Sequence, residues 1–339
     1  MVTYRREIDG LRAVAVLPVL FFHAGFSIFA GGFIGVDIFF VISGYLITSI
    51  LLKEMRVKNF SLLNFYERRA RRILPPLFLV MLCCIPAAFF LMVPNQFIDF
   101  SESLAATSLF SSNFLFWSES GYFAGPSDLK PLLHTWSLAV EEQYYLLFPL
   151  FLMITWPLGF KKTVTILIFL ALCSLGFAHY TSSIAPGFNF YLLPSRGWEL
   201  LIGAFAAYFL INKPVNYKIS SKFLNEAMGI FGLLLIIISI ILFDESTPFP
   251  SLWSLIPTLG TVFIILFASP RTLVGKLLGA KLLVSLGLIS YGAYLWHQPI
   301  FAFARIYKHE LLTTSHYIAF IVISFFLAFI SWKYVENYF

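Results

Sequence analysis

Arg12 and His23 are two ionisable side chains eleven positions apart in one otherwise apolar stretch near the N-terminus. On an α-helix this spacing separates them by roughly 16 Å along the axis and places them on nearly the same face. A neutral imidazole is the usual general base near neutral pH. The pair therefore predicts one polar stripe, from the inner mouth of a membrane helix to its middle, with His23 as the candidate base. The simpler alternatives are that Arg12 anchors the helix at the interface and that His23 is a satisfied core histidine.

Two adjacent carboxylates, Glu141 and Glu142, lie in another apolar stretch shortly after His134 and Trp136. Neighbouring side chains on a helix point about 100° apart, so only one of the two can face a given cavity. We expect one carboxylate to orient or charge a partner His or Arg inside the bundle. The alternative is an acidic pair close to the membrane surface.

Further buried charges are expected at Asp37, at Arg196 with Glu199, and at His297. Arg196 and Glu199 are three residues apart, which allows an ion pair on one helix, and Asp37 could pair with a neighbouring helix. His297 lies deep in an apolar stretch beside Pro299, where its simplest role is a polar partner at a helix kink. Ionisable groups inside a membrane span are costly, so each is also a candidate functional residue.

Four arginines are clustered between residues 68 and 72, just before an apolar stretch. Arg69 and Arg72 are three apart and therefore neighbours on a helix, and guanidinium groups suit a diphosphate or ribose phosphate. The cluster predicts phosphate binding, with a plain anchor to anionic lipid as the alternative.

The composition indicates a membrane protein. Of 339 residues, 59% are apolar, 19% aromatic and 12% charged, which excludes an ordinary soluble protein, and the long apolar runs exclude a β-barrel. The net charge of +6 comes from short Lys and Arg clusters between apolar runs, so we expect it to report topology and not a nucleic-acid partner. The three cysteines and the absence of metal-binding or nucleotide-binding motifs predict no metal and no redox chemistry.

The expected fold is an all-α polytopic protein with about ten transmembrane helices in a single membrane domain, 1–339. The basic clusters fall on one side only if the polar stretch 97–133 does not cross the membrane. That choice predicts both termini inside and an interfacial or re-entrant helix in 97–133 on the outer face. The expected spans are 10–29, 33–52, 73–93, 134–157, 163–180, 194–212, 223–243, 252–269, 282–304 and 317–335.

These residues combine into ordered motifs that resemble the membrane acyltransferase-3 family over essentially the whole chain. The motifs are Ile8 to Arg12 with His23, Gly35 to Leu46, Phe65 to Pro75, Thr135 to Tyr145, Tyr291 to Pro299 and Ser331 to Glu336. The resemblance implies a bacterial O-acyltransferase of the inner membrane, usually an O-acetyltransferase, that uses acetyl-CoA. Its acceptors are cell-envelope carbohydrates such as lipopolysaccharide O-antigen, peptidoglycan or exopolysaccharide.

The resemblance also assigns roles. Arg12 and His23 match the family's Arg-x10-His motif, and Arg69 with Arg72 matches its Arg-x-x-Arg motif, although Arg68 with Arg71 has the same spacing. Glu141 matches the acidic position before the aromatic pair and is expected to orient the His23 ring. A covalent acyl-histidine intermediate is the alternative to general-base catalysis.

The acceptor is expected near residues 118–136, where Trp136 could stack on sugar, unless it only belongs to an interfacial aromatic belt. The other predicted substrate contacts are His134, Asp37, Arg196 and His297. Membrane lipids and an outer SGNH-type domain or partner are further expected partners, because the chain resembles family members that continue into such a domain. The rival interpretation is a transporter or flippase that uses the same buried charges as a path.

Overall fold

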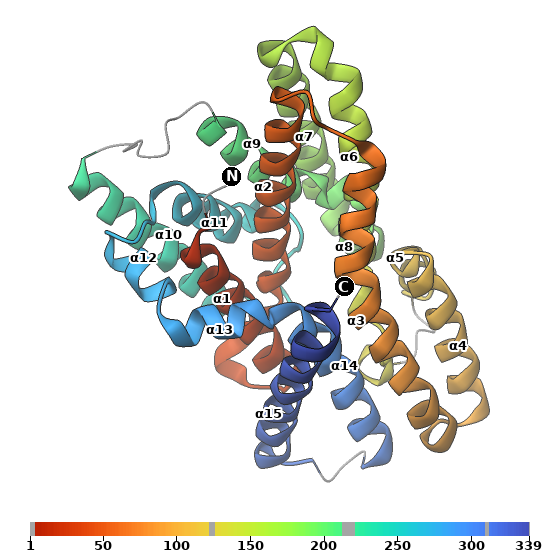
Figure 1. The fold of residues 1–339 in the computed structure, drawn as a ribbon. Helices are drawn as coiled ribbons and strands as arrows, with labels where there is room; N and C mark the ends of the chain where they lie inside the picture. The colour runs from red at the N-terminus through yellow and green to blue at the C-terminus, as the bar shows by residue number, and fades with distance from the viewer. Residues whose placement is uncertain (1–3, 122–125, 212–220, 309–311, 339) are drawn as a thin grey trace.

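The computed structural model describes residues 4–121, 126–211, 221–308 and 312–338, which form helices and no strands. Fifteen α-helices are described (Figure 1): α1 (Arg6–His23), α2 (Gly35–Arg56), α3 (Leu62–Leu91), α4 (Pro94–Ser108), α5 (Ser112–Ser118), α6 (Thr135–Thr155), α7 (Phe160–Ile184), α8 (Pro186–Tyr191), α9 (Leu193–Ile211), α10 (Lys222–Leu242), α11 (Leu255–Phe267), α12 (Leu273–Leu278), α13 (Lys281–Leu288), α14 (Ser290–Tyr307) and α15 (Thr314–Ser331). Short 3₁₀ turns lie at Ser27–Phe29, Gly32–Ile34, Ser127–Leu129, Trp156–Leu158 and Leu252–Ser254, and a π-helical turn at Trp332–Glu336 continues α15.

Six helical segments among the described residues are long and apolar enough to cross a membrane: Gly32–Arg56, Leu62–Leu91, Thr135–Leu158, Phe160–Ile184, Lys222–Leu242 and Thr314–Glu336. Large apolar side chains such as Phe90, Leu242 and Phe326 are exposed on them, as expected of surfaces that face lipid. The chain is therefore a polytopic, all-helical membrane protein. The other predicted spans coincide with helices that are shorter or more polar, namely α1, α9, α11 and the α13–α14 pair.

Two of the expected spans, 282–304 and 10–29, differ from the helices in the structure. The expected span 282–304 is broken at Ile289 into α13 and α14. Gly287 lies so close to α1 that a Cβ there would be 1.8 Å from the carbonyl oxygen of Asp9, so α13 packs across α1 before the chain turns into α14. Apolar composition contains no signal for such a contact.

The first helix begins at Arg6 and ends at His23, whereas the expected span was 10–29. Gly25 follows with φ of 77°, a left-handed conformation that ends helices, and its N–H donates to the carbonyl oxygen of Phe22. His23 is consequently the last residue of α1 and not a mid-helix residue.

The stretch 97–133 forms no span-length helix among its described residues. It contains most of α4, all of α5 and the turn Ser127–Leu129. In Figure 1, α4 and α5 lie at one side of the bundle next to α3, opposite α10 and α12. In place of the single interfacial or re-entrant helix that was predicted, the described residues of this stretch form two short helices, α4 and α5.

The centre of the bundle is made by α1, α2, α6, α9 and α14. At the crossing of α2 and α9, a Cβ on Gly44 would be 1.9 Å from the carbonyl oxygen of Leu200, and one on Gly203 would be 2.0 Å from that of Val41. Glycine is required here because the two backbones are almost in contact, as is common between membrane helices. This close packing fixes the position of the polar residues on α2 and α9.

Candidate active site

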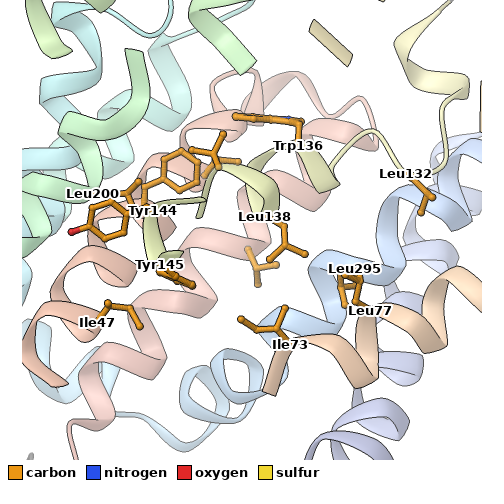
Figure 2. Close-up of a cluster of buried hydrophobic side chains, with 14 of the residues drawn as sticks. Ile47, Ile73, Leu77, Leu132, Trp136, Leu138, Tyr144, Tyr145, Leu200 and Leu295 are labelled. Carbon is orange, nitrogen blue, oxygen red and sulfur yellow. The ribbon is translucent and has the colours of Figure 1, made fainter. Parts of the chain in front are cut away.

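A cavity of about 190 Å³ lies between α1, α2, α3, α6 and α14 and is called here the arginine cavity. Its polar residues are Arg12, Arg69, Arg72, Glu141, Ser43, Ser137, Ser290, Tyr145, Tyr291 and Tyr294. Its apolar wall includes Ile47 of α2, Ile73 of α3, and Leu138 of α6, which point with Tyr145 toward the same space in Figure 2.

The basic cluster lies on helix α3, which is continuous from Leu62. Residues three apart in the cluster are therefore neighbours on one helix face. Arg69 and Arg72 line the arginine cavity. Arg68 instead donates to both carboxylate oxygens of Glu54 at 2.7 and 3.0 Å, and Arg71 pairs with Glu67 at 2.8 Å. The structure therefore separates the two equally spaced pairs: only Arg69 and Arg72 face the cavity.

Two arginine nitrogens in this cavity have unused hydrogen-bonding capacity. Within the described residues, the buried Nε atoms of Arg12 and Arg69 have no hydrogen-bond partner. Arg12 has Asp9 at 4.0 Å as its ion-pair partner. Buried guanidinium donors without acceptors are suited to an anionic ligand.

Glu141 accepts hydrogen bonds from Ser43 at 2.8 Å and from Tyr145 at 3.3 Å. It lines the arginine cavity, whereas Glu142 points to a different cavity beside Arg69. The prediction that the two carboxylates face different surroundings is confirmed. Glu141 has Ser43 and Tyr145 as partners instead of the expected His23, because it lies on the arginine cavity while His23 lies on another.

The second cavity, of about 350 Å³, is called here the histidine cavity. It is lined by His23, His134, Trp136, Arg196, Tyr294 and Arg305 among others. The Nδ1 atom of His23 is 2.9 Å from the carbonyl oxygen of Val19, which can only accept, so Nδ1 must donate. In the neutral ring Nε2 is then the free proton acceptor.

Two more imidazoles surround His23. The ring of His297 is 5.2 Å from that of His23 and 5.4 Å from that of His134, measured between centroids. His297 donates from Nδ1 to the carbonyl oxygen of Tyr294 at 2.6 Å, while its Nε2 and both nitrogens of His134 have no partner among the described residues. No group of three or more His, Cys, Asp or Glu side chains in the described part of the chain could hold a metal ion.

Asp37, Arg196 and Glu199 form a fully buried ionic triad. Nη1 of Arg196 lies 2.9 Å from Asp37 and 3.0 Å from Glu199. Both expected pairings are confirmed: that of Arg196 with Glu199 on one helix and that of Asp37 with a neighbouring helix. The guanidinium also stacks within 5.2 Å of the ring centroids of Trp136 and Phe249.

Trp136 is buried, with 5% of its surface exposed, and packs on Arg196, although it lines the histidine cavity. The neighbouring Tyr191 of α8 lines the same cavity, and burial raises its pKa to about 12. Its hydroxyl therefore stays protonated at neutral pH.

The predicted residues thus divide into two groups. Arg12, Arg69, Arg72 and Glu141 line the arginine cavity, and His23, His134, Trp136 and Arg196 line the histidine cavity. Asp37 and His297 line neither cavity and contact residues that do.

Three functional candidates were not predicted. Val36 and Tyr294 are the two residues that line both cavities. Arg305, at the end of α14, donates to the backbone carbonyl of His23 and lies 3.6 Å from Asp128. The sequence shows Arg305 as an arginine next to an apolar stretch. Because the expected span ended at residue 304, Arg305 was placed outside the membrane and was not considered as a site residue.

The fold and the two cavities define a class: a polytopic membrane protein with an arginine-lined cavity and a histidine-lined cavity that share Val36 and Tyr294 in their walls. A family model described as an acyltransferase domain matches residues 5–333, so the chain belongs to acyltransferase family 3. The expected resemblance is confirmed.

Curated relatives agree with this family. The chain is 34% identical over 347 residues to O-acetyltransferase OatA of Staphylococcus aureus (strain NCTC 8325 / PS 47), an alignment that covers 98% of this chain and 57% of the relative. It is 36% identical over 309 residues to peptidoglycan O-acetyltransferase OatA of Listeria monocytogenes, covering 88% of this chain and 49% of the relative. The chain thus spans about half the length of these relatives. No solved structure matches it.

Proposed function

We propose that the protein is a membrane O-acetyltransferase that moves an acetyl group from cytoplasmic acetyl-CoA to a hydroxyl of peptidoglycan. The observation that carries the proposal is that the arginine and histidine cavities share Val36 and Tyr294 in their walls, so that the two cavities are neighbours. An anionic thioester donor and a hydroxyl acceptor can then approach one reaction centre from opposite cavities.

The donor side rests on the arginines. Arg69 and Arg72 would hold the phosphates of CoA, and the unpartnered donors at Arg12 and Arg69 fit such a polyanion. The pantetheine arm would pass Arg12 along the face of α1 that leads to His23, a rise of roughly 16 Å. The apolar wall around Ile47 and Leu138 suits this uncharged arm.

The chemistry rests on His23. Its Nε2 accepts the proton of the acceptor hydroxyl as the oxygen forms a bond to the thioester carbonyl carbon. The carbon–sulfur bond then breaks, and the proton passes to the departing sulfur, which leaves as the CoA thiol. Arg305 is the cation bonded to the backbone of His23 and is our candidate for stabilising the carbonyl oxygen as it gains negative charge.

Glu141 supports the donor side in this proposal. It shares the arginine cavity with Arg12 and is fixed by Ser43 and Tyr145. Its carboxylate would hold Arg12 in place for the donor, which replaces its expected role of orienting His23.

The acceptor is assigned from the relatives and from the histidine cavity. One relative is named a peptidoglycan O-acetyltransferase. His134, Trp136 and Arg196 line this cavity and would contact the glycan. His297 lies behind them, in contact with His134. Asp37 acts through Arg196, to which it is bonded.

The membrane arrangement follows from the charge pattern. We infer ten crossings in the inner membrane, with both termini and the arginine cavity on the cytoplasmic side and 97–133 on the outer side. The histidine cavity then opens outward, where the glycan and an SGNH-type domain or partner would be found. Membrane lipids surround the exposed apolar faces.

The test is transfer across a bilayer. Purified protein is reconstituted in proteoliposomes with labelled acetyl-CoA on one side and peptidoglycan fragments on the other. We expect labelled, alkali-labile ester on the glycan and CoA thiol on the donor side. No thiol release and no labelled glycan in either orientation would contradict the proposed function and favour transport.

A further inference from the structure

We propose that Val36 and Tyr294 form an aperture that restricts the transferred group to acetyl and excludes longer acyl chains. This inference rests on the proposed function and adds to it a determinant of donor specificity. Val36 and Tyr294 are shared by the walls of the arginine and histidine cavities and therefore stand between them.

Tyr294 is held in place at this boundary. Its hydroxyl donates to the carbonyl oxygen of His134 at 2.9 Å and is 2.6 Å from the hydroxyl of Ser137. Its ring centroid is 5.3 Å from those of both His134 and His297. A ring fixed at its hydroxyl end and packed on two imidazoles cannot easily swing aside.

Val36 forms the other side of the aperture. It lies in the first turn of α2 and is 8% exposed, next to Asp37, whose ion pair with Arg196 ties this turn to α9. The backbone at Val36 is therefore held in place, as the ring of Tyr294 is. Widening the aperture would cost free energy on either side, because contacts would have to break.

Because of its position, the aperture discriminates between acyl groups of different length and does not affect the binding of the CoA part of the donor. The arginines that face the cavity lie on the donor side, and His23 lies on the other. The thioester carbon must therefore sit near the aperture while the acceptor fills the histidine cavity. A longer acyl chain would press on Val36 or the Tyr294 ring, and one methylene in such a pocket changes selectivity by roughly 10- to 200-fold.

The experiment compares Val36→Ala and Val36→Ile with the wild type, using the full chain in nanodiscs. Val41→Ala is the matched control, because Val41 is buried on the same helix and lines neither cavity. The activity readout is kcat/KM for acetyl-CoA, propionyl-CoA and butyryl-CoA, measured by CoA thiol release in the presence of peptidoglycan fragments. The second readout is the Kd of acyl-CoA analogues in which a methylene replaces the sulfur, so that no transfer occurs.

We expect Val36→Ala to raise the propionyl-to-acetyl ratio of kcat/KM by about 10-fold and to tighten binding of the propionyl analogue by a similar factor. Val36→Ile should weaken binding of the acetyl analogue while binding of CoA itself is unchanged. Tyr294→Phe, which keeps the ring and loses both hydroxyl contacts, should raise the propionyl-to-acetyl ratio without any change at Val36.

Unchanged ratios and unchanged analogue binding in all three variants, with an active wild type, would overturn the aperture and leave the proposed function intact. The same ratio change in Val41→Ala would also overturn it. A wild type that releases no thiol from any donor would instead refute the proposed function, and this inference with it.

Discussion

Replacing Arg69 and Arg72 together with Gln should weaken the use of acetyl-CoA, whereas replacing Arg68 and Arg71 should not. Both double variants remove two positive charges from the same helix, so they change the membrane-surface charge equally. Only Arg69 and Arg72 line the arginine cavity, while Arg68 and Arg71 are paired with Glu54 and Glu67. The comparison therefore separates phosphate binding from lipid anchoring.

The size of the effect follows from the two environments. Arg69 has a buried, unpartnered Nε, and a charge-assisted hydrogen bond there is worth about 1.5–3 kcal/mol. Arg72 is exposed, so its contact with phosphate is screened and worth about 0.5–1 kcal/mol. Their sum, about 2–4 kcal/mol, corresponds to a rise in the KM for acetyl-CoA of roughly 30-fold or more.

The assay is initial-rate CoA thiol release in proteoliposomes over a range of acetyl-CoA concentrations, with sedimentation on anionic vesicles as a control for membrane binding. We expect kcat to change little, because the phosphates lie far from the reacting carbon. Equal KM values for the two double variants would refute the assignment of Arg69 and Arg72 to the donor. They would instead support the alternative that the cluster anchors the protein to anionic lipid.

Three other variants test the positioning of the site. Arg196→Met leaves two buried carboxylates without their cation and should destabilise the fold by about 3–5 kcal/mol, measured as a lower Tm; an unchanged Tm would contradict the ion-triad description. Gly44→Ala, whose Cβ would meet an α9 carbonyl oxygen at 1.9 Å, should lower Tm, whereas Gly176→Ala, with nothing within 4 Å, should not, and equal Tm values would argue against the close crossing. Arg305→Gln should lower kcat by roughly 100-fold with little change in the KM for acetyl-CoA, because it removes the cation proposed to stabilise the carbonyl oxygen as that oxygen gains negative charge. A change confined to KM would place Arg305 at the donor instead.

Local spacing was sufficient to predict part of the site. The eleven-residue interval placed Arg12 and His23 on one helix, and the three-residue interval placed Arg69 beside Arg72, as the structure shows. Helical periodicity alone determines such relations within one element. It could not decide between the two arginine pairs, because that choice depends on Glu54, which lies on another helix.

Contacts between different helices could not be predicted from the sequence. The partners of Glu141 come from α2 and from the next turn of α6, and Tyr294 reaches the aperture through contacts with the start of α6. The close approach of Gly287 to α1, just before the break between α13 and α14, is likewise a contact between helices. These features depend on how helices pack, and apolar composition is nearly the same for many packings.

In the proposed mechanism, acetyl transfer from acetyl-CoA depends on His23. The most direct measurement incubates reconstituted wild type and His23→Ala with radiolabelled acetyl-CoA, with and without peptidoglycan fragments. His179→Ala is the matched control, since His179 is exposed on α7 and lines neither cavity. We expect labelled glycan with the wild type and with His179→Ala and none with His23→Ala, all three with the same Tm. Label retained on the wild-type protein without acceptor would identify the acyl-histidine route, whereas labelled glycan formed by His23→Ala at the wild-type rate would show that His23 is not the catalytic residue.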